Sequence, residues 1–504
     1  MPRIPLLGGA YTSRSIIANC MRCINYYPEI NPKNSPVPVT FYQRPGLVPR
    51  AQAATASGTV RGLYRSSQGK SFACIGQEIY QIDANWNLIS LGALNQVAST
   101  PVSFADNGVT MVIADNSSTG YAVNLATNAF SVIVDPTGTF TGATGWDTID
   151  GFLIWNIPGT PIWGSTLDNV LTFNPLYTAA KNNYPDPLQR LICNRHQILL
   201  LGALKSEIWY NAGNPNFPFA ELPGSYIEHG CIAPYSVATA DINTYWLGQD
   251  LQGQGIVFRQ RGYQTERISN HALELAIGRM AKSSGISDCI TYIYQQDGHV
   301  FVVFNFPAGD QTWVWDESIG DPHNGWHQRA WTDANGNLHR DRTNCCANIN
   351  GGIAVGDWQN GTIYTLDLDT YTDTLTVGGT PGPLSCIRTF PHITAGADRT
   401  SGQLVENDGK RLQINKFIAD MEVGEAPLDA AGNPATVNLR WSLDRGKTYG
   451  NDVLQSAGAP GEYLTSPLWQ PLGIGRDIVI ELAHSIAGSA ALNGAWVDVQ
   501  VARS

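Results

Sequence analysis

The chain has 504 residues, enough for two or three domains and a large buried core. Only 14% of the residues are charged, while Gly (51), Tyr (20) and Trp (14) are abundant, a composition that favours turn-rich β structure over helical bundles. The net charge of −11 excludes a global attraction to nucleic acid or acidic lipid.

No segment of the sequence has the length and apolarity of a membrane span. The longest apolar runs, such as QILLLGAL at 197–204, fall far short of the required length. The N-terminal MPRIPLLGGAYTSR has too short an apolar centre for a secretory signal. We therefore expect a soluble protein made in the cytoplasm.

Residues 1–55 contain many prolines and are predicted to form an extended arm, which can become ordered only on its own chain or on a neighbour. Cys20 and Cys23 form a lone C-x-x-C pair in this arm, without further zinc ligands nearby. Nine cysteines are an odd number spread over a long chain, which argues against a disulfide framework. We expect free structural thiols.

Residues 56–398 are predicted to form a β-propeller. Seven segments share one design: an apolar strand, a short polar or Gly-containing turn, and a second strand rich in aromatic or β-branched residues. They begin at Phe72, Met111, Phe152, Ile198, Tyr245, Val300 and Ile353. This spacing of 39 to 55 residues is typical of propeller blades. Six or seven blades result, depending on whether the first and last hairpins close one blade together; the alternative is unrelated hairpins in one or two sandwiches.

Two further elements complete the predicted fold. The apolar spacing of HALELAIGRMAKSS, residues 271–284, predicts a helix inserted between blades. Residues 399–504 begin with a polar stretch and continue with alternating segments separated by Gly/Pro-rich loops, which predicts a C-terminal β-sandwich. The fold class is therefore all-β: a propeller, a sandwich and an N-terminal arm.

The stretch SLDRGKTY, residues 442–449, fits the Asp-box pattern S-x-D-x-G-x-T-aromatic, which recurs in the propeller blades of sialidases and other glycosidases. Glycosidase chemistry also needs two facing carboxylates or an assisted tyrosine nucleophile. Here the box occurs once and lies in the predicted sandwich. Its Ser442 and Asp444 are expected to bond backbone amides of a turn, so we interpret the box as a hairpin device.

Other chemical motifs are incomplete. The GKS at 69–71 and GKT at 446–448 lack the earlier glycine and the following helix of a phosphate loop. No G-x-S-x-G elbow is present. The sequence thus predicts no catalytic residue, no cofactor-binding residue and no cofactor, and we expect no enzymatic activity.

No metal-binding residue is predicted either. His323 and His327 are four apart, but the intervening Pro, Asn and Gly make a helix improbable, and we interpret both as loop histidines without a role. Asp367, Asp369 and Asp373 alternate like a calcium loop but lack its sixth-position Gly and twelfth-position Glu. We expect them on the solvent-facing side of a strand.

The N-terminal region carries a resemblance to a known family. The run SRSIIANCMRCINYYPEINP, residues 13–32, is followed by RPGL at 44–47, VRGLY at 60–64 and the first hairpin. Together these resemble the opening of tail hub proteins of short-tailed bacteriophages, also called nozzle or packaged-DNA stabilisation proteins. The segments RLQINKFIADMEVG and LRWSLDRGKTYG resemble the closing sandwich of that family.

The resemblance implies a structural virion protein of the phage tail. Such hub proteins form a ring of six copies below the head-to-tail adaptor, continue the DNA channel, retain packaged DNA, and offer sites for fibre, spike or needle proteins. They are not enzymes. An acidic or neutral lumen would let DNA slide without tight or sequence-specific binding, and a Pro-rich arm suits large protein contacts.

Two other functions stay open at this point. The first is a host-surface polysaccharide-binding or -degrading propeller tail protein, in which Trp313 and Trp315 could stack on sugars; strand aromatics in propellers more often form inter-blade core. The second is a secreted bacterial propeller of unrelated role, which would be expected to carry a signal segment.

Overall fold

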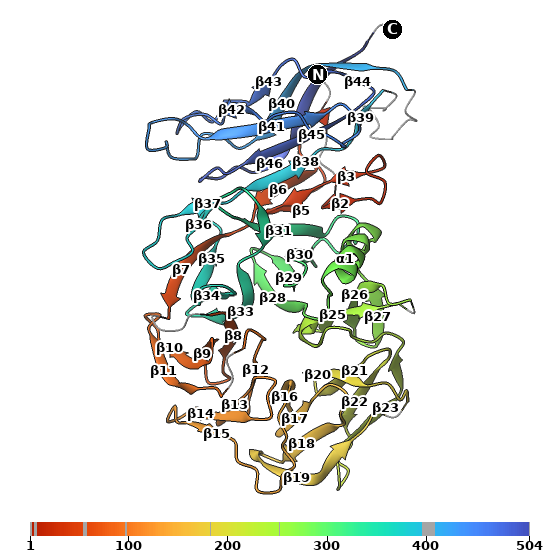
Figure 1. Cartoon of the computed structure of the whole chain (residues 1–504), viewed down its shortest axis with the longest axis vertical. Helices are drawn as coiled ribbons and strands as arrows, with labels where there is room; N and C mark the ends of the chain where they lie inside the picture. The colour runs from red at the N-terminus through yellow and green to blue at the C-terminus, as the bar shows by residue number, and fades with distance from the viewer. Residues whose placement is uncertain are drawn as a thin grey trace.

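The computed structural model describes residues 3–4, 8–53, 58–95, 98–181, 183–250, 252–395 and 409–502. The protein is built almost wholly of strands, as a ring of small sheets with a layered β domain at one end (Figure 1). The described residues contain one α-helix, α1 (His271–Ser283), and one 3-10 helix, η1 (Pro234–Ser236). The predicted all-β fold class is confirmed.

The ring is a seven-bladed propeller. Five blades are separate four-stranded sheets, and the other two are four-stranded parts of larger sheets. Blade I consists of β8 (Val60–Arg65), β9 (Ser71–Ile75), β10 (Glu78–Ile82) and β11 (Leu88–Ala93). Blade II consists of β12 (Ser103–Asp106), β13 (Thr110–Ala114), β14 (Gly120–Asn124) and β15 (Phe130–Val132). Blade III consists of β16 (Gly145–Ile149), β17 (Phe152–Asn156), β18 (Ile162–Thr166) and β19 (Asn169–Ala179).

The remaining four blades follow in chain order, except for one strand. Blade IV consists of β20 (Leu188–Asn194), β21 (Gln197–Gly202), β22 (Ser206–Asn211) and β23 (Phe219–Ile227). Blade V consists of β24 (Ala238–Ala240), β25 (Asn243–Gln249), β26 (Gly255–Arg261) and β27 (Gln264–Arg267). Blade VI consists of β28 (Ile290–Gln296), β29 (His299–Phe306), β30 (Gln311–Asp316) and β31 (Trp326–Thr332). Blade VII consists of β33 (Thr343–Ile349), β34 (Gly352–Asp357), β35 (Thr362–Asp367) and the N-terminal strand β7 (Gly46–Gln52).

All seven predicted hairpins are confirmed, and each is the central pair of one blade. The pairs are β9–β10, β13–β14, β17–β18, β21–β22, β25–β26, β29–β30 and β34–β35. The first and last of them lie in different blades, so the count is seven. First strands of neighbouring blades contact one another around the axis, as β33 does with β8 and β28.

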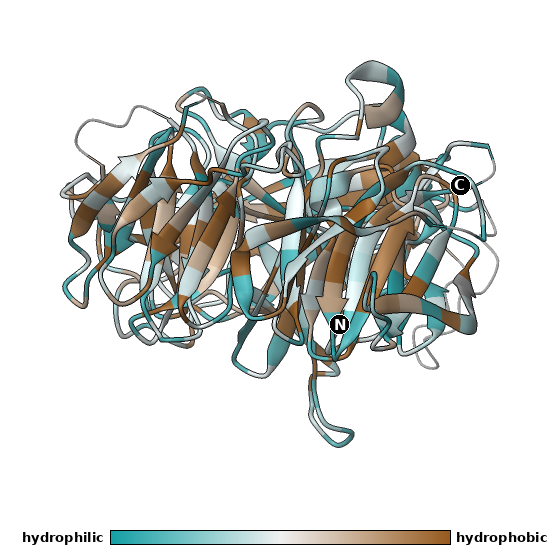
Figure 2. Cartoon of the chain, turned by 90° about the horizontal axis from the view of Figure 1, so that it is seen from below, coloured by the Kyte–Doolittle hydropathy of each residue, from teal (hydrophilic) through white to brown (hydrophobic). Residues whose placement is uncertain are grey.

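Apolar side chains fill the space between neighbouring blades. Separate clusters lie between blades I and II, II and III, III and IV, IV and V, VI and VII, and VII and I. Figure 2 shows hydrophobic residues along the strands and hydrophilic residues in many of the connecting loops. Packing on both faces explains why the strands read as near-continuous apolar runs.

Residues 8–53 are ordered on the chain's own domains. Strand β7 pairs antiparallel with β35 and forms the outer strand of blade VII, so the N-terminal segment closes the ring. Gly46 begins this strand where the backbone passes close to a neighbouring loop: an added Cβ would lie 2.4 Å from the carbonyl oxygen of Thr370. A residue without a side chain is therefore required at this point.

The C-terminal domain is a sandwich of two sheets. One contains β43 (Leu468–Trp469), β40 (Leu412–Met421), β46 (Leu492–Val501), β6 (Val39–Gln43), β5 (Tyr26–Ile30), with β1 (Arg3–Ile4) and β44 (Gly473–Gly475) alongside. The other contains β4 (Cys23–Ile24), β38 (Cys386–Thr389), β45 (Asp477–His484), β41 (Thr436–Ser442), β42 (Val453–Ser456) and β39 (Ile393–Thr394). β2 (Tyr11–Thr12) and β3 (Cys20–Met21) form a separate two-stranded sheet. β36 (Thr372–Asp373) and β37 (Gly382–Pro383) continue the sheet of blade VII beyond β7, and β32 (Leu338–Arg340) pairs with β31.

Propeller and sandwich share one sheet. Ile24 of β4 pairs in parallel with Gln328 of β31 in blade VI, and antiparallel with Ile387 of β38 in the sandwich. A single hydrophobic cluster also extends from blades V and VI through α1 into the sandwich. The domain boundaries predicted at 55/56 and 398/399 stay predictions, since N-terminal strands join both domains and residue 398 lies outside the described residues.

Helix α1 confirms the predicted helix between blades V and VI. The side chain of Asn270 caps it by accepting a hydrogen bond from the Leu273 amide. Leu273, Ile277 and Met280 face the core at helical spacing.

Candidate functional site

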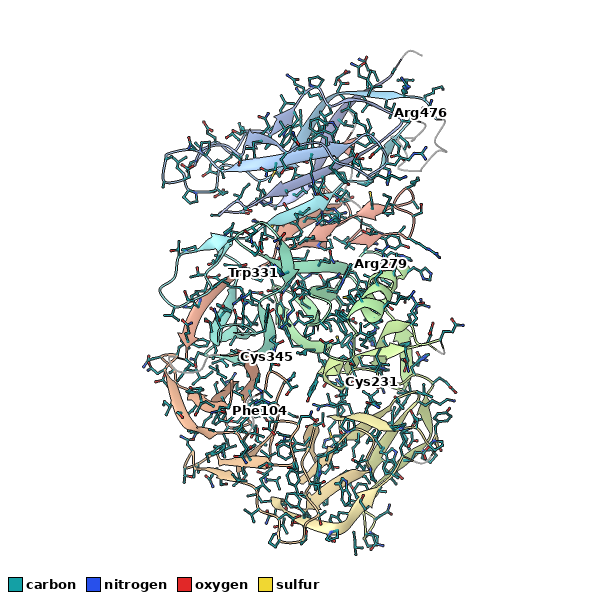
Figure 3. The ribbon with its side chains drawn as sticks, in the orientation of Figure 1. Phe104, Cys231, Arg279, Trp331, Cys345 and Arg476 are labelled. Atoms are coloured by element: carbon teal, nitrogen blue, oxygen red, sulfur yellow. The ribbon has the colours of Figure 1, made fainter. Side chains whose placement is uncertain are left out.

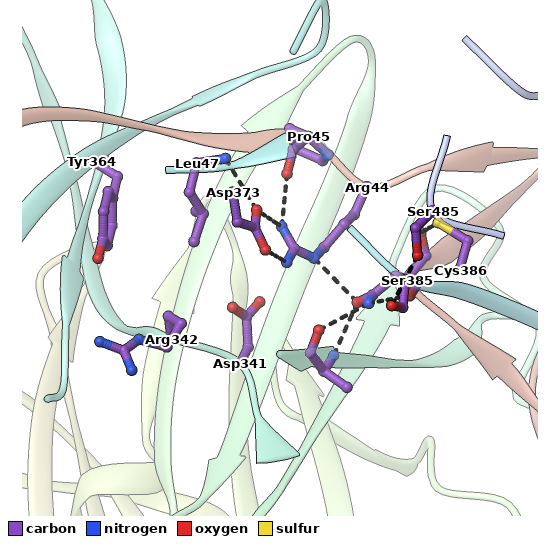
Figure 4. Close-up of polar contacts among 12 residues, drawn as sticks. Arg44, Pro45, Leu47, Asp341, Arg342, Tyr364, Asp373, Ser385, Cys386 and Ser485 are labelled. Carbon is purple, nitrogen blue, oxygen red and sulfur yellow. Dashed lines mark hydrogen bonds and ion pairs between the residues drawn. The ribbon is translucent and has the colours of Figure 1, made fainter. Parts of the chain in front are cut away.

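Two of the resemblance motifs, the run at residues 13–32 and the RPGL at 44–47, meet at the junction of blade VI, blade VII and the sandwich. We call this junction the N-terminal seam and define it by Asn25, Tyr26, Arg44, Leu47 and Asp373. Figure 4 shows the polar contacts around Arg44, with Asp373 on one side and the sandwich residues Ser385, Cys386 and Ser485 on the other. Each motif that the sequence made conspicuous here has a structural role.

Arg44 and Asp373 form a bidentate ion pair in the interior. Arg44 is 2% exposed and Asp373 is 3% exposed. Nη2 and Nη1 of Arg44 donate to Oδ2 and Oδ1 of Asp373 at 2.5 and 3.1 Å, and the Leu47 amide donates to the same Oδ1 at 3.3 Å. Burial opposes the positive charge, but the carboxylate more than compensates and raises the pKa of Arg44. The two parallel hydrogen bonds have the geometry of an ion pair, and the pair holds β7 against β36.

Asn25 links the two domains through four hydrogen bonds. Its Nδ2 donates to the carbonyl oxygens of Ala330 in blade VI and Ser385 in the sandwich, at 2.8 and 2.7 Å. Its Oδ1 accepts from the Ala330 amide and from Nε of Arg44. Asn25 has a φ of 58°, a left-handed conformation that Asn tolerates better than most residues, where the chain turns from β4 into β5.

Asp373 corrects a prediction. We expected Asp367, Asp369 and Asp373 on the solvent-facing side of a strand. Asp369 is exposed in a turn and Asp367 is partly exposed at the end of β35, whereas Asp373 is buried by its ion pair. No local feature of the sequence indicates this role, because the partner Arg44 lies 329 residues away.

The Asp box forms a turn, as predicted. Ser442 Oγ accepts from the Gly446 amide at 2.8 Å, and Asp444 Oδ1 accepts from the Thr448 amide at 2.9 Å. Hydrogen bonds from Ser442 and Thr448 lower the pKa of Asp444. The residues act on their own turn between β41 and β42, so the geometry supports the interpretation of the box as a hairpin device.

A cysteine, a histidine and an aspartate that are distant in sequence meet beside this turn. Cys20 Sγ lies 3.4 Å from Nε2 of His392, and Nδ1 of His392 lies 2.6 Å from Oδ1 of Asp477. This group cannot be recognised from the sequence alone, since its members come from three separate segments. Nε2 of His392 also lies 3.0 Å from the carbonyl oxygen of Ile16, a shared contact that ties residues 16–20 to the sandwich.

The ionisation of His392 fits a structural role. Burial alone would lower its pKa, but hydrogen bonds to Asp477 and Cys20 raise the pKa to about 10. The imidazole is thus protonated at neutral pH and donates from both ring nitrogens. Cys20 itself is only 8% exposed.

The remaining motif residues serve local packing. Lys70 of the GKS stretch donates from Nζ to Leu125 O and Asn128 Oδ1, which connects blades I and II. His323 lies in an exposed turn, as expected for a loop residue. The prediction was wrong for His327, which belongs to β31 and is 1% exposed; burial, assisted by the nearby Arg329, lowers its pKa.

All nine cysteines are free, among them Cys231 and Cys345 of the propeller, which Figure 3 labels. Within the described ranges, no group of three or more His, Cys, Asp or Glu side chains is arranged to hold a metal ion. In the same part of the chain, no helix combines the length and apolarity needed to cross a bilayer.

Comparisons with known proteins cover both domains. A family model described as "Bacteriophage P22 Gp10, beta-propeller" matches residues 2–371, and one described as "Bacteriophage P22 Gp10, beta-sandwich" matches residues 399–500. Together they confirm the resemblance to tail hub proteins. No curated protein matches the sequence.

Solved structures similar to this chain include other propellers. The WD40 β-propeller domain of Doa1 has 11% identity and a TM-score of 0.38, and the alignment covers 64% of this chain and 98% of that one. The RRP9 WD40 repeats have 9% identity, a TM-score of 0.40 and coverages of 64% and 99%. The computationally designed Ika8 protein has 10% identity, a TM-score of 0.37 and coverages of 73% and 100%.

Proposed function

The chain belongs to the bacteriophage P22 Gp10 family, with a propeller and a sandwich that each match a model of that family, and from this premise we propose that it is a hub subunit of a phage tail. The chain is a structural protein of the tail that assembles with other virion proteins. In the proposed role, six copies form a ring below the head-to-tail adaptor. The ring continues the DNA channel and retains the packaged genome.

The match over both domains is the observation that carries this proposal. The architecture supports it, because the N-terminal seam and the shared sheet hold propeller and sandwich as one unit. A net charge of −11 per copy suits a passage along which DNA moves without tight binding. Fibre, spike or needle proteins would attach to this ring, and no turnover is proposed.

The carbohydrate-directed alternative receives no support from the aromatic residues that suggested it. Trp313 and Trp315 are 7% and 0% exposed and belong to the large core cluster. Their indole Nε1 atoms donate to the side chains of Gln311 and Glu317. They therefore stabilise blade VI and are not available to stack on a sugar.

The proposal is tested by removing the gene from the phage and examining the particles by electron microscopy, with a count of DNA-filled heads. We expect tailless heads that package DNA and then lose it. Complementation with the wild-type gene should restore full heads. Intact tails on full heads that fail only to attach to or digest the host surface would contradict the hub proposal and favour the carbohydrate-directed alternative.

Ring formation needs a separate measurement. Mass photometry of the purified chain, alone and with the purified adaptor ring, should show six bound copies on the adaptor. A variant at the exposed Arg195–Asp241 pair serves as a control for general surface changes. Binding of a single copy to the adaptor, or of none, would contradict the proposed ring.

A further inference from the structure

A pocket of about 600 Å³ opens at the propeller axis, between the loops that lead into the first strands of several blades. Its wall includes Thr100 before blade II, Tyr235 of η1, Asp288 before blade VI, and Asn344 of β33. This size lies within the range of small-molecule sites. The pocket is separate from the N-terminal seam.

Arg340 gives the pocket a buried positive charge that nearby aspartates, Asp288 of the same wall among them, offset only in part. The side chain is 7% exposed, and its guanidinium carbon lies 4.1 Å from the ring centroid of Trp358, which also lines the pocket. Burial lowers its pKa to about 10, so the group is charged at neutral pH. Among the described residues Nη1 has no hydrogen-bond partner, and no carboxylate forms an ion pair with this guanidinium. A buried charge without a partner is costly.

Two further buried arginines add positive charge near Tyr235. Arg61 and Arg190 both act on the pKa of Tyr235, which burial raises and these cations oppose. Arg61 donates to the carbonyl oxygens of Thr100 and Gly76, and Arg190 to that of Thr144. Neither forms an ion pair with a carboxylate in the described part of the chain, so neutral carbonyl groups are their main partners.

Acceptors in the pocket also lack partners. Oδ1 of Asp288 and Oδ1 of Asn344 are buried and accept no hydrogen bond from any described group, and Oη of Tyr235 is likewise unpartnered. Oδ2 of Asp288 accepts from the Ala308 amide, so that carboxylate is oriented by the backbone. A complementary ligand therefore carries an anionic group for Arg340 and an N–H donor beside it for the free acceptors.

We propose that this axial pocket binds a carboxylate with a neighbouring N–H group, as in a free amino acid or the C-terminal end of a peptide chain. The planar guanidinium of Arg340 pairs with the carboxylate. Asp288 and Asn344 accept from the N–H group, and Trp358 forms an apolar wall. The carboxylate of Asp288 in the same pocket disfavours a doubly charged phosphate.

The test is isothermal titration calorimetry of the full chain with triglycine, triglycinamide, glycine and inorganic phosphate at constant ionic strength. Triglycine should bind and triglycinamide should not, because the amide lacks the charge that Arg340 recognises. Binding of glycine as tight as that of triglycine would identify a free amino acid as the source, and preference for triglycine a chain terminus. Binding of phosphate without triglycine, or no binding at all, overturns the proposal.

Variants separate this pocket from other surfaces. Arg340→Gln should weaken triglycine binding at least about tenfold, while Arg279→Gln on the exposed face of α1 (Figure 3) should leave it unchanged. Tyr235→Phe removes only the hydroxyl and should weaken binding about threefold, which keeps the proposal testable if Arg340→Gln fails to fold. Unchanged affinity in the Arg340 and Tyr235 variants that fold would overturn the assignment.

Discussion

Blades I to V differ from blades VI and VII in how the chain builds them. Each of the first five is one continuous stretch of sequence that folds back on itself three times. Blade VII takes its outer strand from residues 46–52, and the sheet of blade VI continues through β4 into the sandwich. One side of the ring therefore relies on local contacts, and the side next to the sandwich relies on contacts between distant parts of the chain.

The largest effect should come from removing the long-range side altogether. A chain lacking residues 1–53 loses β7, most of the seam and the four sandwich strands β1, β4, β5 and β6, so the ring cannot close. We expect a loss of more than about 5 kcal/mol, comparable with the whole stability of an ordinary domain, seen as aggregation or early melting by circular dichroism. Addition of residues 1–53 as a separate peptide should restore part of the stability. A truncated chain that melts like the wild type would show that β7 is not needed to close the propeller ring.

The next largest effect should be the difference in stability lost when an ion pair is broken beside the sandwich or between two of the first five blades. Arg44→Met leaves Asp373 buried without its partner and should cost about 3–5 kcal/mol in urea unfolding. Arg195→Met breaks a pair whose side chains are 63% and 71% exposed and should cost at most about 1 kcal/mol. The double variant Arg44→Met, Asp373→Leu should recover much of the loss. Equal costs for the two single variants would remove the distinction between the two sides.

A smaller, pH-dependent effect is expected at His392. Its pKa is about 10 in the folded chain and about 6.5 when unfolded, so its protonation stabilises the fold fully below pH 6.5 and ceases to do so as the pH rises toward 10. His392→Gln should therefore destabilise by about 1 kcal/mol at pH 6, since the site is partly open to solvent, and by little at pH 10. Melting at both pH values checks this, with the exposed His196→Gln as control. A pH-independent difference would exclude the protonated state.

The smallest effect should remain within one turn. Asp444→Ala removes the acceptor of the Thr448 amide in the exposed turn between β41 and β42. Hydrogen exchange of that amide should become faster, while the exchange of β45 amides and the melting temperature stay unchanged. Faster exchange throughout the sandwich would show that the turn stabilises the whole domain and not only its own backbone.

Pairings between strands close in sequence were also the ones that the sequence predicted well, on both sides of the ring. The central hairpin of each blade combines a short turn with two apolar strands, and this pattern is complete within about 15 residues, as from Phe72 to Asp83 or Ile353 to Asp367. The partners of the first and fourth strands, and the blade count, depend on how hairpins meet in space. The partners of β5, β6 and β7 also depend on the three-dimensional fold, and the prolines of this N-terminal region suggested an extended arm instead of strands.

The sites followed the same division. The turn chemistry of Ser442 and Asp444 could be predicted because both partners lie within a few residues. The buried state of Asp373, the strand position of His327 and the axial charge of Arg340 could not, since each depends on a neighbour that only the fold supplies. The RPGL and RG motifs drew attention to Arg44 and Arg61, but neither motif indicates which residues these arginines contact.

The seam also determines when the protein can finish folding on the ribosome. Arg44 leaves the ribosome 329 residues before Asp373, an interval of roughly 16 to 66 s at about 5–20 residues per second. During that time β7 has no β35 to pair with, and the β5–β6 hairpin lacks β46, the other partner of β6. β7 and β6 therefore keep unpaired edges until β35 and β46 have been translated, and unpaired edges are prone to aggregation. Synthesis of this chain should therefore depend on chaperones that bind the first fifty residues while the propeller assembles.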